Sequence, residues 1–276
     1  MASSDGAGEA GANQSRTALK TVSATSPDIS LMDFDAAAEQ QLLGLANQAR
    51  THDGLPPLAL DAGLTQAARA HAEAMYQAHQ LSHQFDGEPS LVERLAAATH
   101  AQLDQEGENV ALDFDAADAQ KNLMLSPPHR ANLMNAAYNV IGLGVVRNGD
   151  RLYIVQDFGH ALPNYSAAEV KDRIADALLK LRNQFRQPAL AQRDLPATDA
   201  AACSMAQEDK LGTSPIQQLA QRYTLLTYTT LNPETLPESA YQTLRGRNLH
   251  GFSVGACYSR TETYPMGAYW VVLALD

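Results

Sequence analysis

The sequence predicts an α/β protein in which helices cover a β-sheet, and the order of two kinds of pattern supports this fold class. Stretches with apolar residues at helical spacing occupy most of residues 35–125. Two strand-like runs follow, joined by Asn148-Gly149-Asp150, a tight-turn signal typical of a β-hairpin. Helices that precede an antiparallel hairpin favour a sheet with helices packed on it. The length of 276 residues leaves room for two domains.

The first 32 residues differ in composition from the rest of the chain. They are rich in Ala, Gly, Ser and Thr and show almost no apolar periodicity. We therefore expect residues 1–32 to be a disordered segment. The start of the chain lacks the apolar core of a signal peptide. A tether that followed a removed export signal would have this composition, and so would an ordinary flexible terminus.

The apolar patterns of the first half define its expected elements. Helices are expected over residues 35–50, 64–79, 90–98 and 115–125, and strands over residues 138–147 and 151–158. Gly54 and the prolines at 56 and 57 end the first helix. Asp61 or Thr65 is expected to cap the second helix, because both side chains accept hydrogen bonds from backbone N–H groups at a helix start.

The stretch Ser126-Pro127-Pro128-His129-Arg130 separates the last of these helices from the hairpin. Each proline lacks an N–H and has a fixed φ, so the helix cannot continue through them. We expect a turn here that presents His129 beside Arg130. Loops held by a rigid scaffold carry a large share of functional residues.

Charge and composition exclude some classes of function. The net charge of −11 argues against nucleic acids and anionic membrane surfaces as partners. No apolar run is long enough for a transmembrane segment. The two cysteines, Cys203 and Cys257, are too few for a disulfide framework but can form one bridge.

A set of short motifs resembles the bacterial branch of the CAP superfamily, which comprises cysteine-rich secretory proteins, antigen 5 and pathogenesis-related 1 proteins. The motifs occur in the order and spacing of that family. They are Asn47-Gln48-Ala49-Arg50, Gly54-Leu55-Pro56-Pro57-Leu58, His71-Ala72-Glu73-Ala74-Met75, Leu81-Ser82-His83, Gly107-Glu108-Asn109-Val110-Ala111, Ser126-Pro127-Pro128-His129-Arg130-Ala131-Asn132-Leu133 and Ile141-Gly142-Leu143-Gly144-Val145.

The resemblance implies a three-layer α-β-α sandwich in a protein that is secreted or attached to the cell surface. It also implies a cavity lined by His83, Glu108 and His129, which in several members holds a divalent metal such as zinc. Animal and plant members carry a second glutamate on the third long helix, where this chain has Leu123, Met124 and Leu125. The fourth residue of such a site is therefore missing here.

The chemistry of the three side chains allows two interpretations. Two neutral imidazoles and one carboxylate can bind zinc if water fills the open position. Alternatively, His83, Glu108 and His129 form a hydrogen-bonded polar cluster without metal or chemistry, since a buried carboxylate needs partners. The three residues lie far apart in the sequence, and no His-Glu-x-x-His motif is present.

Arg130 and Gln156 complete the predicted ligand-binding set. Arg130 can bind an anionic ligand, but we expect its charge to form an ion pair with a local acid such as Glu93 or Asp157. Strand alternation places Gln156 and Phe158 on one face of the sheet and Asp157 on the other.

The second half repeats the element order of the first, which predicts a degenerate CAP-like copy. We expect domains at residues 33–162 and 163–276, with second-half helices over residues 166–185 and 197–207. Val254-Gly255-Ala256-Cys257 echoes Ile141-Gly142-Leu143-Gly144, and the stretch from Arg245 to Leu249 echoes the stretch from Arg130 to Leu133. The copy has no acid between residues 223 and 230, where Glu108 is expected, and the place of His129 falls near Leu244.

Three functions remain open at this point. The chain is a secreted binding module for a small-molecule, lipid or envelope-derived ligand, a hydrolase that uses a metal-bound water in the same cavity, or a structural module without chemistry. The sequence identifies no catalytic residue, because no nucleophile motif is present. If the repeat is correct, Cys203 lies on a helix packed against the strand of Cys257, and the two are close enough to bridge.

Overall fold

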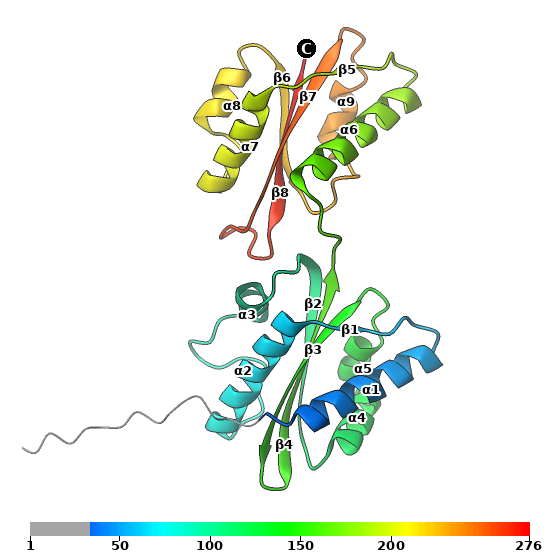
Figure 1. Cartoon of the computed structure of the whole chain (residues 1–276), viewed down its shortest axis with the longest axis vertical. Coiled ribbons are helices and arrows are strands. Elements are labelled where there is room, and N and C mark those ends of the chain that lie inside the picture. The colour runs from blue at the N-terminus through cyan, green and yellow to red at the C-terminus, as the bar shows by residue number, and fades with distance from the viewer. Residues whose placement is uncertain (1–33) are drawn as a thin grey trace, which may run out of the picture. The chain divides into compact units, whose positions relative to one another are not determined.

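A computed structural model describes residues 34–276 (Figure 1). The predicted disordered segment, residues 1–32, lies outside the described residues. The described chain contains two four-stranded sheets with the strand orders β1-β3-β4-β2 and β5-β7-β8-β6. Each sheet is built from one half of the sequence, so the halves are described separately below. No helix in residues 34–276 has the length and apolar character needed to cross a membrane.

The N-terminal half contains five helices and four strands within the described residues. They are α1 (Ala36–His52), β1 (Ala59–Leu60), α2 (Ala62–Ala78), α3 (Leu91–Ala98), β2 (Leu103–Asp113), α4 (Ala116–Leu125), α5 (Pro127–Leu133), β3 (Val140–Asn148) and β4 (Arg151–Ala161). The predicted helices and hairpin are confirmed to within a few residues. Strand β2 was not among the predicted strands, and it pairs with β4 along nearly its whole length.

Helices cover both faces of this sheet, which gives the expected three-layer sandwich (Figure 1). On one face, Ile141, Leu143 and Val145 of β3 pack with residues of α1, α4 and α5. On the other face, β3 presents Gly142 and Gly144 to α2. A Cβ on Gly142 would lie only 2.1 Å from the backbone carbon of Leu64, so this close approach of helix and sheet requires glycine.

The double proline gives a helix rather than the predicted non-helical turn. Pro127 and Pro128 are the first residues of α5, where the missing N–H groups would have no intrahelical partner in any case. The chain does change direction between α4 and α5 at Ser126. The sequence argument was correct that α4 ends there, and wrong that helical structure stops.

The C-terminal half repeats the strand order of the N-terminal half. Its elements are α6 (Ala167–Gln184), β5 (Ala191–Gln192), α7 (Pro196–Glu208), α8 (Ser214–Leu219), β6 (Thr224–Thr230), α9 (Glu238–Thr243), β7 (Gly251–Ser259) and β8 (Ala268–Leu275). Helices α6 and α9 share one core cluster with β7 and β8, and α7 packs with Trp270 and Val272 on the opposite face. The short helices α8 and α9 were not predicted, since each spans only six residues.

A fully buried arginine occupies the same place in each half. The Arg50 guanidinium donates to the carbonyls of Pro56, Leu133, Asn135 and Tyr138, at 2.9–3.0 Å. The Arg182 guanidinium donates to the carbonyls of Pro188, Leu244 and Gly246. Each arginine ties the end of the first helix of its half to the segment that precedes the central strand. Burial lowers the pKa of both guanidinium groups.

These contacts fix the alignment of the two halves. Leu244 accepts from Arg182 as Leu133 accepts from Arg50, and each leucine lies seven residues before the strand that follows, β7 or β3. The predicted echo between Leu249 and Leu133 is therefore wrong by five residues. Gly255 approaches the backbone of Thr198 closely, as Gly144 approaches Ala68, but this alignment equates Gly255 with Gly144, so the predicted echo of Gly142 is wrong by two residues.

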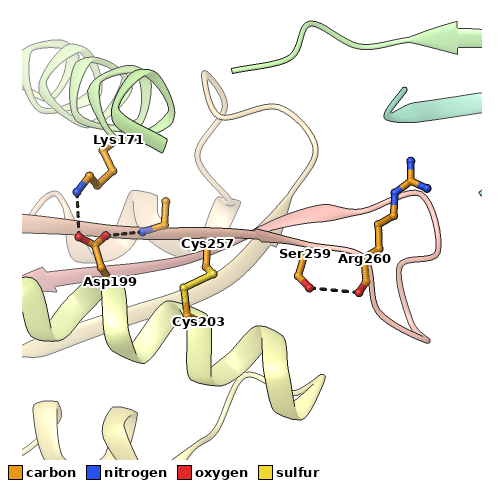
Figure 2. The surroundings of a disulfide bond; sticks show 7 residues. Lys171, Asp199, Cys203, Cys257, Ser259 and Arg260 are labelled. Atoms are coloured by element: carbon orange, nitrogen blue, oxygen red, sulfur yellow. Dashed lines mark hydrogen bonds and ion pairs between the residues drawn. A yellow bond between two sulfur atoms is a disulfide. The ribbon is translucent and has the colours of Figure 1, made fainter. Parts of the chain in front are cut away.

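The two cysteines form a disulfide between α7 and β7 (Figure 2). The Cα atoms of Cys203 and Cys257 lie 5.0 Å apart, within the range that a bridge requires. Beside the bridge, the Asp199 carboxylate pairs with Lys171 at 2.9 Å and accepts the Ala256 N–H at 3.2 Å. The predicted proximity of the two cysteines is confirmed.

We predict that replacing either buried arginine by lysine destabilises the protein. A single ammonium cannot reach all the carbonyls, and each buried carbonyl left unpaired costs about 1–3 kcal/mol. Arg50→Lys and Arg182→Lys should each lower the free energy of unfolding by at least about 2 kcal/mol, measured by urea denaturation. The exposed Arg147→Lys is the control and should change it by less than about 0.5 kcal/mol. Equal midpoints for all three variants would contradict the anchoring role.

Candidate functional site

The candidate site is centred on the contact between His83 and Glu108. His83 lies in the loop after α2, and Glu108 lies on β2. The His83 Nδ1 is 2.9 Å from Glu108 Oε1. The His83 side chain is 60% exposed, whereas that of Glu108 is 4% exposed. A carboxylate that accepts from Nδ1 fixes the imidazole tautomer, so Nε2 of His83 is available to solvent or a ligand.

A buried charge network supports Glu108 from behind. Arg94 of α3 donates to the other carboxylate oxygen of Glu108 and pairs with Glu88 at 3.1 Å. The fully buried His71 lies 2.6 Å from Glu88 through Nδ1 and 2.9 Å from the Ser82 carbonyl through Nε2. These bonds attach the loop that carries His83 to α2 and α3, so the position of His83 is set by the buried groups.

The carboxyl groups in this network differ in their protonation behaviour. Burial raises the pKa of Glu88, but hydrogen bonds from Phe85 N–H and His71 and the charge of Arg94 bring that pKa below its usual value. Asp157 faces Glu108 across the β2–β4 pairing and is fully buried. Burial and the neighbouring Glu108 carboxylate raise the pKa of Asp157 well above its usual range. A proton on Asp157 removes the repulsion between the two acids and supplies a donor.

His129 is the third predicted residue and comes from α5. Its Nδ1 is 2.9 Å from Ser126 Oγ. Burial and the charge of nearby His83 lower the pKa of His129, which favours the neutral imidazole. The structure therefore brings His83 and Glu108 into contact and places His129 close enough to His83 for their charges to interact.

Asparagine side chains hold α5 against β2. The Asn132 Nδ2 donates to the Glu108 carbonyl at 3.0 Å and to Asn109 Oδ1 at 2.9 Å. The Asn109 Nδ2 donates to the His129 carbonyl and to Gln156 Oε1, both at 3.1 Å. This chain of amides fixes the distance between the strand of Glu108 and the helix of His129.

Within residues 34–276, the side chains of Arg130 and Gln156 form no hydrogen bond with those of His83, Glu108 or His129. Arg130 is half-exposed and pairs with Asp53 at 3.3 Å, so the expected ion pair with Glu93 or Asp157 is wrong. Glu93 instead forms a capping box with Ser90. Gln156 is fully buried on the opposite face of the sheet from Asp157, as strand alternation predicted. Its role here is to support Asn109 from within the core.

Several residues of the site were not predicted. Arg94, Glu88 and Asp157 carry the buried charges, yet each lies in a segment with an ordinary local pattern. The one local signal is that Arg94 stands between apolar residues on the buried side of α3. Asp157 has no such signal, because its partner Glu108 is distant in the sequence.

The geometry does not match a ready three-ligand metal site. Among residues 34–276, no group of three His, Cys, Asp or Glu side chains is arranged to hold a metal ion. Both Glu108 oxygens already accept hydrogen bonds, one from His83 and one from Arg94. The positive charge of Arg94 also opposes a divalent cation at Glu108. The metal site on His83, Glu108 and His129 stays a prediction.

The corresponding positions in the C-terminal half carry no such chemistry. With Leu244 aligned to Leu133, strand pairing places Leu225 where Glu108 stands and Ala274 where Asp157 stands. Counting back from Leu244 places Ala240, in α9, where His129 stands. This corrects the earlier expectation that the place of His129 falls near Leu244.

Comparison with known proteins identifies the family of the N-terminal half. Residues 43–158 match the model of the cysteine-rich secretory protein family, CAP. The N-terminal half of the chain is a CAP domain. This match includes Glu108 and His129 as well as the buried charge network around them.

Two relatives come from Bacillus subtilis. The CAP domain region is 34% identical over 126 residues to the uncharacterized membrane protein YlbC, covering 45% of this chain and 35% of that protein. It is 31% identical over 136 residues to the uncharacterized protein YkwD, covering 48% of this chain and 50% of that protein. The chain thus spans half or less of the length of these relatives.

Among solved structures, the chain resembles an extracellular protein from Bacillus anthracis that contains an SCP domain. The identity is 29% and the TM-score is 0.40, with 45% of this chain and 40% of that chain covered.

We predict that Asn132→Ala is more destabilising than Pro128→Ala. Asn132 donates to two acceptors that would lose a partner, which costs about 1–3 kcal/mol at a buried position. Pro128 contributes only its fixed φ and accepts substitution in the first turn of a helix. Urea denaturation of both variants gives the comparison, and equal midpoints would show that the amide chain does not anchor α5.

We predict that Asp157→Asn stabilises the CAP domain at neutral and higher pH. The folded-state pKa of Asp157 is raised, so the native state binds more protons than the unfolded state above about pH 4. The wild type therefore loses stability as the pH rises towards that folded-state pKa, and the asparagine variant does not titrate.

The stability advantage of Asp157→Asn should grow between about pH 5 and about pH 8, measured by urea denaturation at each pH. The exposed Asp176→Asn is the control and should show no such trend. An advantage that shrinks as the pH rises would mean that Asp157 is ionised in the folded state.

Proposed function

We propose that this chain is an exported protein, extracellular or attached to the cell surface, whose CAP domain binds a small envelope-derived ligand at His83, Glu108 and His129. The observation that carries the proposal is the exposed His83 imidazole held on the buried Glu108 carboxylate, at 2.9 Å. The buried charges behind this pair hold one accessible side chain in a fixed orientation, which is the arrangement that a binding site needs.

The disulfide supports the export part of the proposal. Bridges such as Cys203–Cys257 persist in oxidising compartments and are rare in the reducing cytosol. The family of the matching domain is described as secretory, which agrees with this location.

The chemistry of the site favours a polar ligand over a lipid. His83 offers Nε2 to solvent, and the largely neutral His129 adds a second imidazole that can donate or accept. Both Glu108 oxygens already accept a hydrogen bond, so Glu108 orients His83 rather than receiving the ligand itself. Hydroxyl and amide groups of an envelope glycan fragment match two imidazoles better than an acyl chain does.

The C-terminal half is, in this proposal, a degenerate second CAP-like domain at residues 163–276. The shared strand order, the buried arginines and the matching glycines Gly144 and Gly255 support it. With Leu225 and Ala274 in place of the two acids, this domain has a structural or interaction role.

Divalent metal binding is the second candidate, favoured by the lowered pKa of His129, since a neutral imidazole is the form that binds metal. The Arg94 charge and the occupied Glu108 oxygens weigh against it. The hydrolase alternative depends on a metal-bound water, so we assign no catalytic step.

Titration of the full chain with soluble glycan fragments of the cell envelope tests the proposal. We expect NMR shifts at the loop of His83 and at α5, and binding weakened at least about tenfold in His83→Ala and His129→Ala. The exposed His100→Ala is the matched control and should bind as the wild type does. Shifts elsewhere, or equal binding by all variants, would refute the site.

The same variants titrated with zinc chloride separate the two candidates. Stoichiometric binding that both histidine variants lose would establish the metal site. Zinc binding that persists in both variants would place any metal elsewhere.

A further inference from the structure

One helix of the CAP domain has no counterpart in the C-terminal half. In the N-terminal half, β2 is followed by α4, which packs against α1, α5 and β2, and only then by α5. In the C-terminal half, β6 is followed directly by residues 231–237 and α9. Helices α6 and α9 lie on the same face of their sheet (Figure 1). The place that α4 fills beside α1 is therefore not filled by a helix beside α6.

A groove occurs at this place. Its larger part has a volume of about 750 Å³ and is lined by the start of α9, with Leu236, Tyr241 and Arg245. A smaller part of about 240 Å³ continues between α9 and α6, where Ala177, Leu181 and Tyr241 line it. Tyr241 is 40% exposed, and its ring meets the Phe185 ring edge-on.

We propose that this α6–α9 groove binds an amphipathic helix supplied by another protein, with a face of small apolar residues and an acidic first turn. These are the properties of α4, the helix that packs on the equivalent face of the N-terminal half. Helix α4 buries Ala116, Ala119 and Leu123, and its first turn carries Asp118 beside the cap Asp115. A partner helix with these properties restores the layer that the C-terminal half lacks, by the helix-in-groove mode.

The charges around the groove agree with an acidic helix start. Within residues 34–276, Lys180 and Arg245 have no carboxylate within ion-pair distance. Glu234 lines the smaller part of the groove, but it is paired with Arg173. Glu238 is the single unpaired acid of the lining, against two unpaired cations. An acidic first turn of the partner is attracted to Lys180 and Arg245.

A peptide with the sequence of residues 113–127 tests this inference on the full-length protein. Short helices are marginal in water, so the peptide carries Ala117→Glu joined to Lys121 by a lactam on its exposed face. We expect NMR shifts confined to α6, α9 and residues 231–237. Ala177→Arg fills the groove and should weaken binding at least about tenfold. The adjacent exposed Asp176→Ala is the matched control and should leave binding unchanged.

Charge-reversed peptides test the role of Lys180 and Arg245. Asp115→Lys and Asp118→Lys in the peptide should weaken binding at least about tenfold, and more strongly at low ionic strength. An unaffected charge-reversed peptide would overturn the orientation, since the first turn would not face Lys180 and Arg245.

Three results would overturn the proposal. They are no binding at millimolar peptide, binding that Ala177→Arg does not alter, and shifts outside the groove. The alternative occupant of the groove is a second copy of this chain, and sedimentation of the full chain over a range of concentrations tests for it. If the chain self-associates and Ala177→Arg abolishes this association, the groove binds a second copy and not a foreign helix. None of these outcomes depends on the ligand site of the CAP domain.

Discussion

Each half of this molecule depends on one buried guanidinium that satisfies backbone carbonyls from segments without regular structure. Arg50 donates to carbonyls at the end of α5 and between α5 and β3, and Arg182 donates to carbonyls between α9 and β7. A buried carbonyl without a donor costs about 1–3 kcal/mol, so these irregular segments need such a partner to lie in the core. Because α5 carries His129, the Arg50 anchor also determines where the candidate site forms.

The site shows how buried charges are used to fix one exposed side chain. Arg94 and His71 compensate Glu88 and Glu108, and Asp157 avoids a further uncompensated charge through its raised pKa. Removing one partner of such a network is costly, because it leaves a charge buried without compensation. The network therefore holds His83, its exposed member, in one orientation.

The sequence allowed prediction of the elements and of the residues of the site, but not of the network beneath it. Helical spacing and the Asn148-Gly149-Asp150 turn located the helices and the hairpin, since these are local signals. His83 and Glu108 were found through motifs of the family, not through spacing. Asp157 was missed because its environment is created by strand pairing with Glu108, and the sequence of either strand alone does not determine the pairing register. Pro127 and Pro128 were misjudged because the same residue that ends one helix can begin the next.

Comparison of the halves separates what the fold requires from what the site requires. The close helix–sheet approach keeps a glycine, at Gly144 and Gly255. A carboxylate also accepts a central-strand N–H in both halves, but Glu39 on the first helix does so in one and Asp199 on the second helix in the other. The basic partner is exchanged in the same way, from Arg69 on the second helix to Lys171 on the first. The requirement is thus for an accepting oxygen with a cation beside it, and not for a particular residue.

The acids Glu108 and Asp157, by contrast, are replaced by Leu225 and Ala274, with no charge left in their place. Burying two carboxylates beside each other is unfavourable for folding, so the fold of the sheet alone does not call for them. Function therefore best explains why the N-terminal half carries both acids, and this is the half in which we propose the ligand site.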